Sequence, residues 1–341
     1  MAMGRNLRRW VGAAGVLAFV GLALFGARHL RDESDGHTMV YGRDPALPTL
    51  TFYTTGFATT PQLPFWEALG SGDILEYCNI RVVLWKNLDD LRGVLLAGKG
   101  DLWLGHTEGF AQAHAAGAPV TLLLISGWRK FHIVTRDPAL QDIDDLAGRD
   151  LPFAPADSPA VFVLTALGDA GAMSIRFQPH EPRQLALLLH SGRVDTALVP
   201  EPLASTLLSR DASLRVAGSV EQWYGRRTGG PARMPIAGMA VHRETARRHP
   251  ELIAHLVAAM AAAAQRLQAD PQVGVAALPP AFEAYIPREI VTRSLERDPV
   301  LLQPAAAVAD EIDGYLRMLM PELMASARSP MADPAFLWSP P

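Results

Sequence analysis

The chain has 341 residues, 49% of them hydrophobic, which is enough to bury two ordinary cores, so we expect a globular protein of two lobes. Five of its 31 Lys and Arg fall within the first 31 residues, which leaves 26 against 35 Asp and Glu and argues against nucleic acid as a partner. The single cysteine, Cys78, excludes an intramolecular disulfide and a cysteine-rich metal site, and we expect no metal and no cofactor.

Residues 1–31 form a candidate targeting segment. Arg5, Arg8 and Arg9 precede an uncharged, mostly apolar run over residues 10–27. This order is typical of an export signal, and the run is just long enough to span a bilayer. A cleaved signal peptide and an uncleaved anchor both remain open, as do the twin-arginine and the general export routes.

A phrase of the sequence occurs twice in the chain. LAGKGDLWLGHTEG, residues 96–109, and HSGRVDTALVPEPLAS, residues 190–205, share a glycine, a basic residue, an aspartate and an apolar run in the same order. We interpret each as the end of a helix, a glycine stop and a strand. The two aspartates, Asp101 and Asp195, begin their strands and are therefore expected to be structural.

The repeat extends in both directions and predicts strands that alternate with helices. In the first half, the strands are Leu50–Tyr53, Ile80–Trp85, Asp101–Gly105 and Val120–Ile125, and helices begin at Pro61, at Leu88 and near Glu108. In the second half, the strands are Leu151–Ala154, Ser174–Phe177, Asp195–Val199 and Leu214–Ala217, and helices begin at Pro159, at Pro182 and near Glu201. Such alternation indicates an α/β fold of two lobes, each a mostly parallel sheet flanked by helices, with a cleft between them.

Two apolar segments are expected to connect the lobes. The run Phe131–Thr135 follows directly on the strand that ends at Ile125, and Ala232–Arg243 is placed to return the chain. A long helix, about Pro250–Gln268, follows that return. The predicted organisation is residues 46–127 with 232–326 as the first lobe, 128–231 as the second lobe and 327–341 as a loose tail.

These phrases resemble a known family, the nitrate/sulfonate/taurine and thiamine-precursor type of ABC-transporter solute-binding protein. SGRVDTALVPEPLAS is similar to the family's sGevDAavvpEP element, LAGKGDLWLGHTEG to aGeiDia, and AAGAPVTLLLIS to its GaPv crossing strand. The resemblance covers roughly residues 48–265. The stretch LPFWEALGSGDILEYCNI departs from the family's usual lAkekGlFkkeGL, so the ligand class is not carried over.

The resemblance implies a two-lobed periplasmic binding fold of type II and an exported, monomeric protein in the periplasm. It also implies that a small polar or anionic molecule is captured between the lobes and delivered to an ABC permease, with membrane contact only through the N-terminal segment. A membrane-anchored sensory or accessory protein on the same fold, or an exported enzyme, remains open as an alternative.

The candidate site residues follow the strands, because loops at the carboxyl edge of such sheets face the cleft. The candidates are Thr54, Thr55, Gly56, His106, Thr107, Glu108, Trp128, Arg129, Asp157, Ser158 and Glu201. For Ser158, and for Thr60 at the matching helix start, the alternative is a helix N-cap, and for His106 it is a core histidine. For Glu201 the alternative is an acidic residue in the first turn of a helix, and for Arg129 it is a solvated basic residue. We expect the helix that begins at Pro159 to hold an anionic group, with Arg129 as its cation. No catalytic arrangement is found, so no enzyme is expected.

Overall fold

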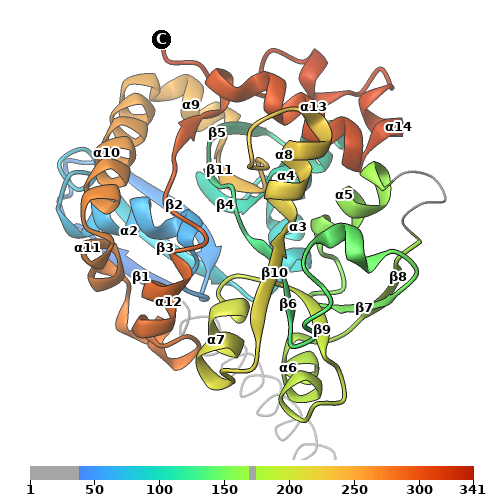
Figure 1. Cartoon of the computed structure of the whole chain (residues 1–341). Coiled ribbons are helices and arrows are strands. Elements are labelled where there is room, and N and C mark those ends of the chain that lie inside the picture. The colour runs from blue at the N-terminus through green and yellow to red at the C-terminus, as the bar shows by residue number, and fades with distance from the viewer. Residues whose placement is uncertain (1–37, 169–173) are drawn as a thin grey trace, which may run out of the picture.

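A computed structural model describes residues 38–168 and 174–341, and it contains two β-sheets with helices packed around them (Figure 1). The expected two-lobed α/β fold is confirmed. The candidate targeting segment, residues 1–31, lies outside the described residues.

The first sheet has seven strands, and its three central neighbours β3, β2 and β4 run parallel. The other neighbours pair antiparallel, so the sheet is mixed rather than mostly parallel. Its order is β1 (Thr38–Tyr41), β3 (Asn79–Trp85), β2 (Thr49–Thr55), β4 (Leu102–His106), β11 (Ala237–His242), β5 (Val120–Gly127) and β12 (Gln303–Pro304).

The second sheet has five strands and is also mixed. Strands β9, β7 and β8 are parallel, while β10 and β6 add on antiparallel, because β6 enters from the other lobe in the opposite direction. Its order is β10 (Arg215–Ser219), β6 (Phe131–Thr135), β9 (Thr196–Pro200), β7 (Asp150–Phe153) and β8 (Arg176–Pro179). Strand β8 begins two residues after the expected Ser174.

Helices cover both sheets. Those that follow strands of the first sheet are η1 (Thr60–Gln62), α2 (Leu63–Gly70), α3 (Leu88–Leu96), α4 (Thr107–Ala115) and α9 (Arg243–Arg248). Those within the second half are η2 (Ile143–Leu146), α5 (Pro159–Leu167), α6 (Pro182–His190), α7 (Leu203–Arg210) and α8 (Val220–Thr228). The C-terminal part adds α10 (Pro250–Ala269), α11 (Pro271–Ala277), η3 (Pro280–Ala284), α12 (Arg288–Ser294), η4 (Ala305–Val308), α13 (Ala309–Leu319), α14 (Pro321–Met324) and η5 (Pro330–Ala332).

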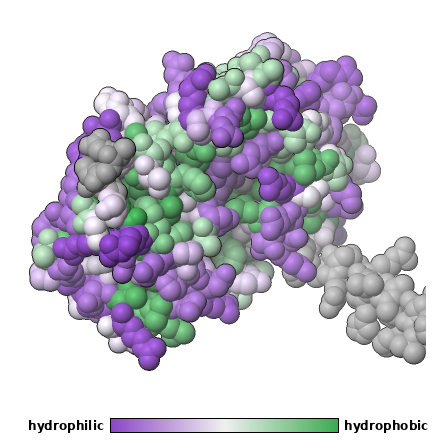
Figure 2. Space-filling view, turned by 90° about the vertical axis from the view of Figure 1, so that its right-hand side faces the viewer, coloured by the Kyte–Doolittle hydropathy of each residue, from purple (hydrophilic) through white to green (hydrophobic). Residues whose placement is uncertain are grey.

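Helix α10 is long and apolar enough to cross a membrane by length and composition alone. Helix α10 packs beside α2 (Figure 1). One of its faces, which includes Ile253, Leu256, Met260 and Leu267, is buried in the same core as α2. It is therefore a core helix of the first lobe. Over the described residues on the face in Figure 2, green hydrophobic groups are interspersed with purple hydrophilic ones, as is usual for a surface in contact with water.

The repeated phrase has a structural cause. Gly98 and Gly192 both have a left-handed backbone, with φ of +60° and +68°, just after α3 and α6. Only glycine adopts this conformation without strain, and it ends each helix so that the next strand can begin. Asp101 accepts hydrogen bonds from Thr51 N and from Thr245 Oγ1, both at 2.8 Å, so its expected structural role is confirmed.

Two segments cross between the lobes and are hydrogen-bonded to each other. Met234 N donates to Trp128 O at 3.1 Å, and Ile236 N donates to Gly127 O at 3.0 Å. A Cβ on Gly127 would lie 2.7 Å from Pro61 Cγ and 2.9 Å from Ala237 Cβ, so this position has room only for glycine. The crossing is therefore a tightly packed pair of segments that connects the end of β5 and the start of β11 with the second lobe.

The expectation of a loose tail over residues 327–341 is wrong. Leu122 N donates to Phe336 O at 2.7 Å, and Trp338 N donates to Leu122 O at 2.9 Å, so the segment lies along β5. Phe336 is fully buried and Trp338 nearly so. Burial of Phe336 and Trp338, at alternate positions, fixes this segment in place, although polar and proline residues surround them.

Candidate ligand-binding cleft

A cleft of about 540 Å³ lies where the two sheets face each other. It is bordered by residues at the carboxyl ends of β2, β4 and β9, namely Thr55, His106 and Pro200, and by Phe131 at the start of β6. Its polar lining residues are Thr55, Thr59, His106, Lys130, Asp157, Arg183, Glu201, Thr206 and Arg210. Its larger apolar ones are Phe57, Trp85, Leu88, Leu104, Phe131, Tyr285 and Ile286. A cavity of this size and character suits one small molecule.

Lys130 lies in this cleft, in the segment that crosses between the lobes. Its backbone is held on both sides, because Lys130 N donates to Glu221 Oε1 at 2.8 Å and Lys130 O accepts from Glu201 N at 2.7 Å. Burial lowers the pKa of the ammonium, and the charges of Asp298, Glu108, Asp157 and Glu221 oppose that shift. The fold therefore fixes the base of this side chain and surrounds it with carboxyl groups.

Asp298, after α12, is one of these carboxyl groups and is only 3% exposed. Burial raises its pKa to about 8, against a hydrogen bond from Thr60 and the charge of Lys130, which lower it. Its Oδ1 has no hydrogen-bond partner in the part of the chain that the structure describes. At neutral pH the side chain is consequently mostly protonated and does not neutralise Lys130.

Glu201 also lies at the cleft but is committed to protein contacts. Its Oε1 accepts from Arg297 Nε at 2.6 Å, and its Oε2 accepts from Ser205 N at 3.1 Å in the first turn of α7. His132 Nε2 is 4.0 Å from Glu201 Oε1, but burial and the charge of Arg297 lower the pKa of His132 to about 4. The imidazole is therefore neutral near pH 7, and the two residues do not form an ion pair there.

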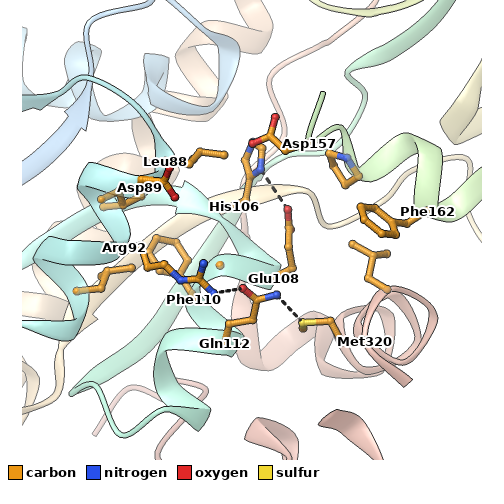
Figure 3. A pocket seen from close by; sticks show the side chains of 15 residues that line it. Leu88, Asp89, Arg92, His106, Glu108, Phe110, Gln112, Asp157, Phe162 and Met320 are labelled. Atoms are coloured by element: carbon orange, nitrogen blue, oxygen red, sulfur yellow. Dashed lines mark hydrogen bonds and ion pairs between the residues drawn. The ribbon is translucent and has the colours of Figure 1, made fainter. Parts of the chain in front are cut away.

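A second chamber of about 400 Å³ adjoins the cleft and shares Leu88, His106, Asp157 and Pro159 with it (Figure 3). Figure 3 shows Glu108 directed at His106, and their Oε1 and Nδ1 atoms are 3.1 Å apart. Asp89, Glu108 and Asp157 give this chamber an acidic lining, with Arg92 as its arginine. The two chambers therefore differ in charge on either side of His106 and Asp157.

The structure brings five of the predicted site residues to these chambers. Thr55 and Glu201 line the cleft, Glu108 lines the second chamber, and His106 and Asp157 line both. The other six predicted residues are outside the lining of both chambers: Thr54, Gly56, Thr107, Trp128, Arg129 and Ser158.

Two of those six misses, Trp128 and Arg129, fall at the crossing, and the expectation that they face the cleft is wrong. Trp128 is 1% exposed, donates from Nε1 to Leu301 O at 3.0 Å and packs beneath Arg233, whose guanidinium carbon is 4.5 Å from the ring centroid. Arg129 is exposed and donates from Nε to Ala232 O at 3.1 Å. The neighbouring Lys130, rather than Arg129, is the basic residue of this crossing that lines the cleft.

The remaining misses arise from side-chain direction. Thr54 is buried and its hydroxyl donates to Gln62 Oε1 at 3.3 Å, while Gly56 lies against Leu84 and Tyr285 beside the cleft. Thr107 and Ser158 are buried, and neither hydroxyl has a partner within the described residues.

The two predicted N-caps also differ from expectation. Ser158 occupies the N-cap position of α5, but its hydroxyl makes no capping hydrogen bond. Thr60 is not an N-cap, because η1 begins at Thr60 and Thr59 holds that position. The sequence located these helix starts to within a residue but not the hydrogen bonds at them.

Other cleft residues were missed, either on helices that were predicted without assigning these side chains to the site or in the C-terminal part of the chain. Arg183 and Arg210 lie on α6 and at the end of α7, and Tyr285 follows η3. Tyr285 packs on Phe57 with ring centroids 5.4 Å apart. Within residues 38–168 and 174–341, no group of three or more His, Cys, Asp or Glu side chains is arranged to hold a metal ion.

Comparison with solved structures finds proteins of similar fold. The periplasmic aliphatic sulphonate binding protein SsuA from Escherichia coli is similar with a TM-score of 0.67 and 16% identity, over 87% of this chain and 94% of that one. The fold is that of the two-lobed periplasmic binding proteins. An ABC transporter protein from Parabacteroides distasonis is similar with a TM-score of 0.65 and 15% identity, over 86% of this chain and 99% of that one.

The nitrate-binding protein NrtA from Synechocystis PCC 6803 has the same periplasmic binding fold. It is similar with a TM-score of 0.58 and 14% identity, over 85% of this chain and 86% of that one. Neither the protein-family models nor the curated proteins that were compared match the chain. At these identities the likeness establishes the fold, while the ligand has to be argued from the cleft itself.

Proposed function

We propose that this protein is an exported solute-binding protein of the periplasm, which captures a small polar or anionic molecule between its lobes and delivers it to an ABC permease. The lobes of this proposal comprise residues 46–127 with 232–326, and residues 128–231. It acts as a monomer, without a cofactor and without catalysis.

The observation that carries the proposal is the position of the cleft. It lies between two sheets, beside the paired crossing segments, and takes its lining from both lobes. Rotation about such a crossing brings the two walls together, which is how hinged proteins enclose a ligand. The solved proteins with this fold include those whose names state sulphonate or nitrate binding, and this supports a similar role.

The start of α5 supports an anionic or strongly accepting group on the ligand. Pro159 begins the helix and lines both chambers, and its first turn contains no acidic residue. The N-terminus of a helix favours a nearby negative charge by about 0.3–1 kcal/mol. The acidic second chamber supports, in addition, a positively charged group at the other end of the same ligand, which would then be zwitterionic.

A thermal-shift panel tests the binding function. Sulfonates, nitrate, amino acids, pyrimidines and metal complexes are each added to the protein, and at one hundred times its dissociation constant a true ligand adds about 2.7 kcal/mol of stability. Small-angle scattering with the hit should give a smaller radius of gyration than without it. No stabilising compound, or a radius that does not change at saturation, would contradict the proposal.

Export is tested separately. A fusion of residues 1–45 to a reporter that is active only outside the cytoplasm is expected to be active. The N-terminal mass of the mature protein then distinguishes a cleaved signal from an anchor. A reporter that stays inactive in the cytoplasm would contradict the periplasmic location. Neighbouring permease and ATPase genes favour transport, whereas a kinase or cyclase gene favours the sensory alternative.

A further inference from the structure

Lys130 is a cation in the cleft without a counter-ion. Among the described residues, no carboxylate oxygen lies within 4.0 Å of its ammonium group, whereas Arg136, Arg233 and Arg297 form ion pairs at 2.5–3.3 Å. Arg183 and Arg210 also line the cleft without an ion pair among these residues, but both are exposed to water, whereas Lys130 is partly buried. Burial of a charge is costly unless an opposite charge accompanies it. The question is therefore which group completes this pair.

The nearby carboxyl groups are each engaged elsewhere or uncharged. Glu221 Oε1 accepts from the backbone N–H groups of Lys130 and Phe131, and its Oε2 accepts from Ser219 Oγ at 2.8 Å. Glu201 is paired with Arg297 at 2.6 Å. Both carboxylates are thus engaged by other groups, and neither has an oxygen within 4.0 Å of the Lys130 ammonium.

The remaining carboxyl groups do not complete the pair either. Asp298 is buried, and burial favours its neutral form by raising its pKa to about 8. It has no oxygen within 4.0 Å of the Lys130 ammonium. Glu108 is hydrogen-bonded to His106 in the second chamber. Asp157 is exposed to water at the junction of the two chambers.

We propose that Lys130 is the specificity-determining residue of the cleft and forms an ion pair with the anionic group of an organic ligand whose apolar part packs in the same cleft. This inference rests on the proposed binding function and deepens it. The rest of the lining supports the apolar part, since Phe57, Trp85, Phe131 and Tyr285 provide aromatic surface in the same cleft. A carboxylate and a sulfonate share the chemistry that the ammonium recognises.

The test compares each anion with its neutral amide. Benzoate, benzenesulfonate and the anionic hits of the ligand panel are titrated by calorimetry into the wild-type protein, and benzamide and benzenesulfonamide are titrated beside them. The wild type is expected to prefer the anions by tenfold or more. In Lys130→Met this preference is expected to vanish, while Lys130→Arg keeps part of it.

Two controls separate binding from folding. Arg129→Met changes the adjacent residue, which lies outside the cleft and donates to Ala232 O, and it should leave the preference unchanged. Lys130→Met keeps the apolar stem and removes a buried charge, so its melting temperature should equal or exceed that of the wild type. A drop in melting temperature together with retained preference would mean that Lys130 is only structural.

The outcomes also distinguish this inference from the function on which it rests. A panel ligand whose affinity is the same in Lys130→Met, or a ligand that proves to be neutral or a bare cation, overturns the role of Lys130 and leaves the binding function intact. Absence of a preference for anions in the wild type would likewise overturn the role of Lys130 and leave the binding function intact. Absence of any ligand in the whole panel overturns both.

Discussion

The guanidinium of Arg297 donates from Nε to Oε1 of Glu201 over 2.6 Å, and this ion pair joins the C-terminal part of the first lobe to the second lobe. Arg297 follows α12, which packs on α7. Glu201 is 3% exposed, so its buried carboxylate is stabilised mainly by the Arg297 guanidinium and by the backbone N–H of Ser205. We call this ion pair, which lies at one side of the cleft, the latch.

Removal of the latch should be costly. In Arg297→Ala the Glu201 carboxylate is left buried without its cation, which is expected to lower the free energy of unfolding by about 3 kcal/mol. Chemical denaturation measures the change. The matched control is Arg293→Ala, whose exposed pair with Glu289 on α12 should contribute less than about 0.5 kcal/mol. Equal decreases in the free energy of unfolding for the two variants would show that the latch contributes no more than an exposed ion pair.

Asp298 should make the protein less stable as the pH rises. Its pKa is about 8 in the folded protein and 3.8 as the ordinary value. Between these limits the folded chain keeps a proton that the unfolded chain has released, so the free energy of unfolding falls as pH increases through this window. Asp298→Asn removes this dependence and is expected to stabilise the protein on the order of 3 kcal/mol at pH 7 and little at pH 4. Denaturation curves at both pH values check it, and an equal gain at both would contradict the assignment.

His132 should act in the opposite direction. Its pKa is lowered from 6.5 to about 4, so between these values the unfolded chain holds a proton that the folded chain lacks. The free energy of unfolding is therefore unaffected by this histidine above pH 6.5 and decreases as the pH falls from 6.5 to 4. His132→Gln should therefore flatten the acid side of a melting-temperature profile between pH 6.5 and 4. An acid side as steep as that of the wild type would refute this.

Gly127 should tolerate no side chain at the crossing. An alanine Cβ there would meet Pro61 and Ala237 at less than 3 Å, and such overpacking typically costs about 1–3 kcal/mol. Gly93→Ala is the control, because an added Cβ on α3 has no atom within 4 Å and alanine favours the helix. Thermal unfolding compares the two variants. Ligand-induced compaction measured by scattering should also change in Gly127→Ala if the crossing is the hinge.

Sequence patterns predicted the elements of this fold well because they depend on local residues. The glycines after α3 and α6, the prolines at the starts of α5 and α6, and the apolar runs of β4, β5 and β9 are each visible within a few positions. The positions of β11 and β12 in the first sheet depend on pairing over long sequence separations, and this made the sheet mixed rather than mostly parallel.

The cleft could be predicted only in part, because side-chain direction is not set by position along the chain. Trp128, Arg129 and Lys130 are consecutive, yet one is buried beneath Arg233, one is exposed and one lines the cleft. No periodic pattern covers a crossing of three residues, so the sequence did not indicate which of them faces the ligand. Arg297 is 96 residues from Glu201 in the sequence, and Asp298 is still farther from Thr60 and Lys130, so neither residue gave a local signal.

The final residues of the chain have a consequence for how copies of the protein behave toward one another. Strand β5 is buried on one side by β11, but β12 pairs with it only at Ile125 and Leu124. Phe336 and Trp338 occupy the backbone groups of Leu122 that would otherwise be open. An unpaired strand edge of this apolar sequence is a template for association with a second chain. The C-terminal segment therefore shields the molecule against aggregation, and truncation before Phe336 would endanger solubility well before it touched the cleft.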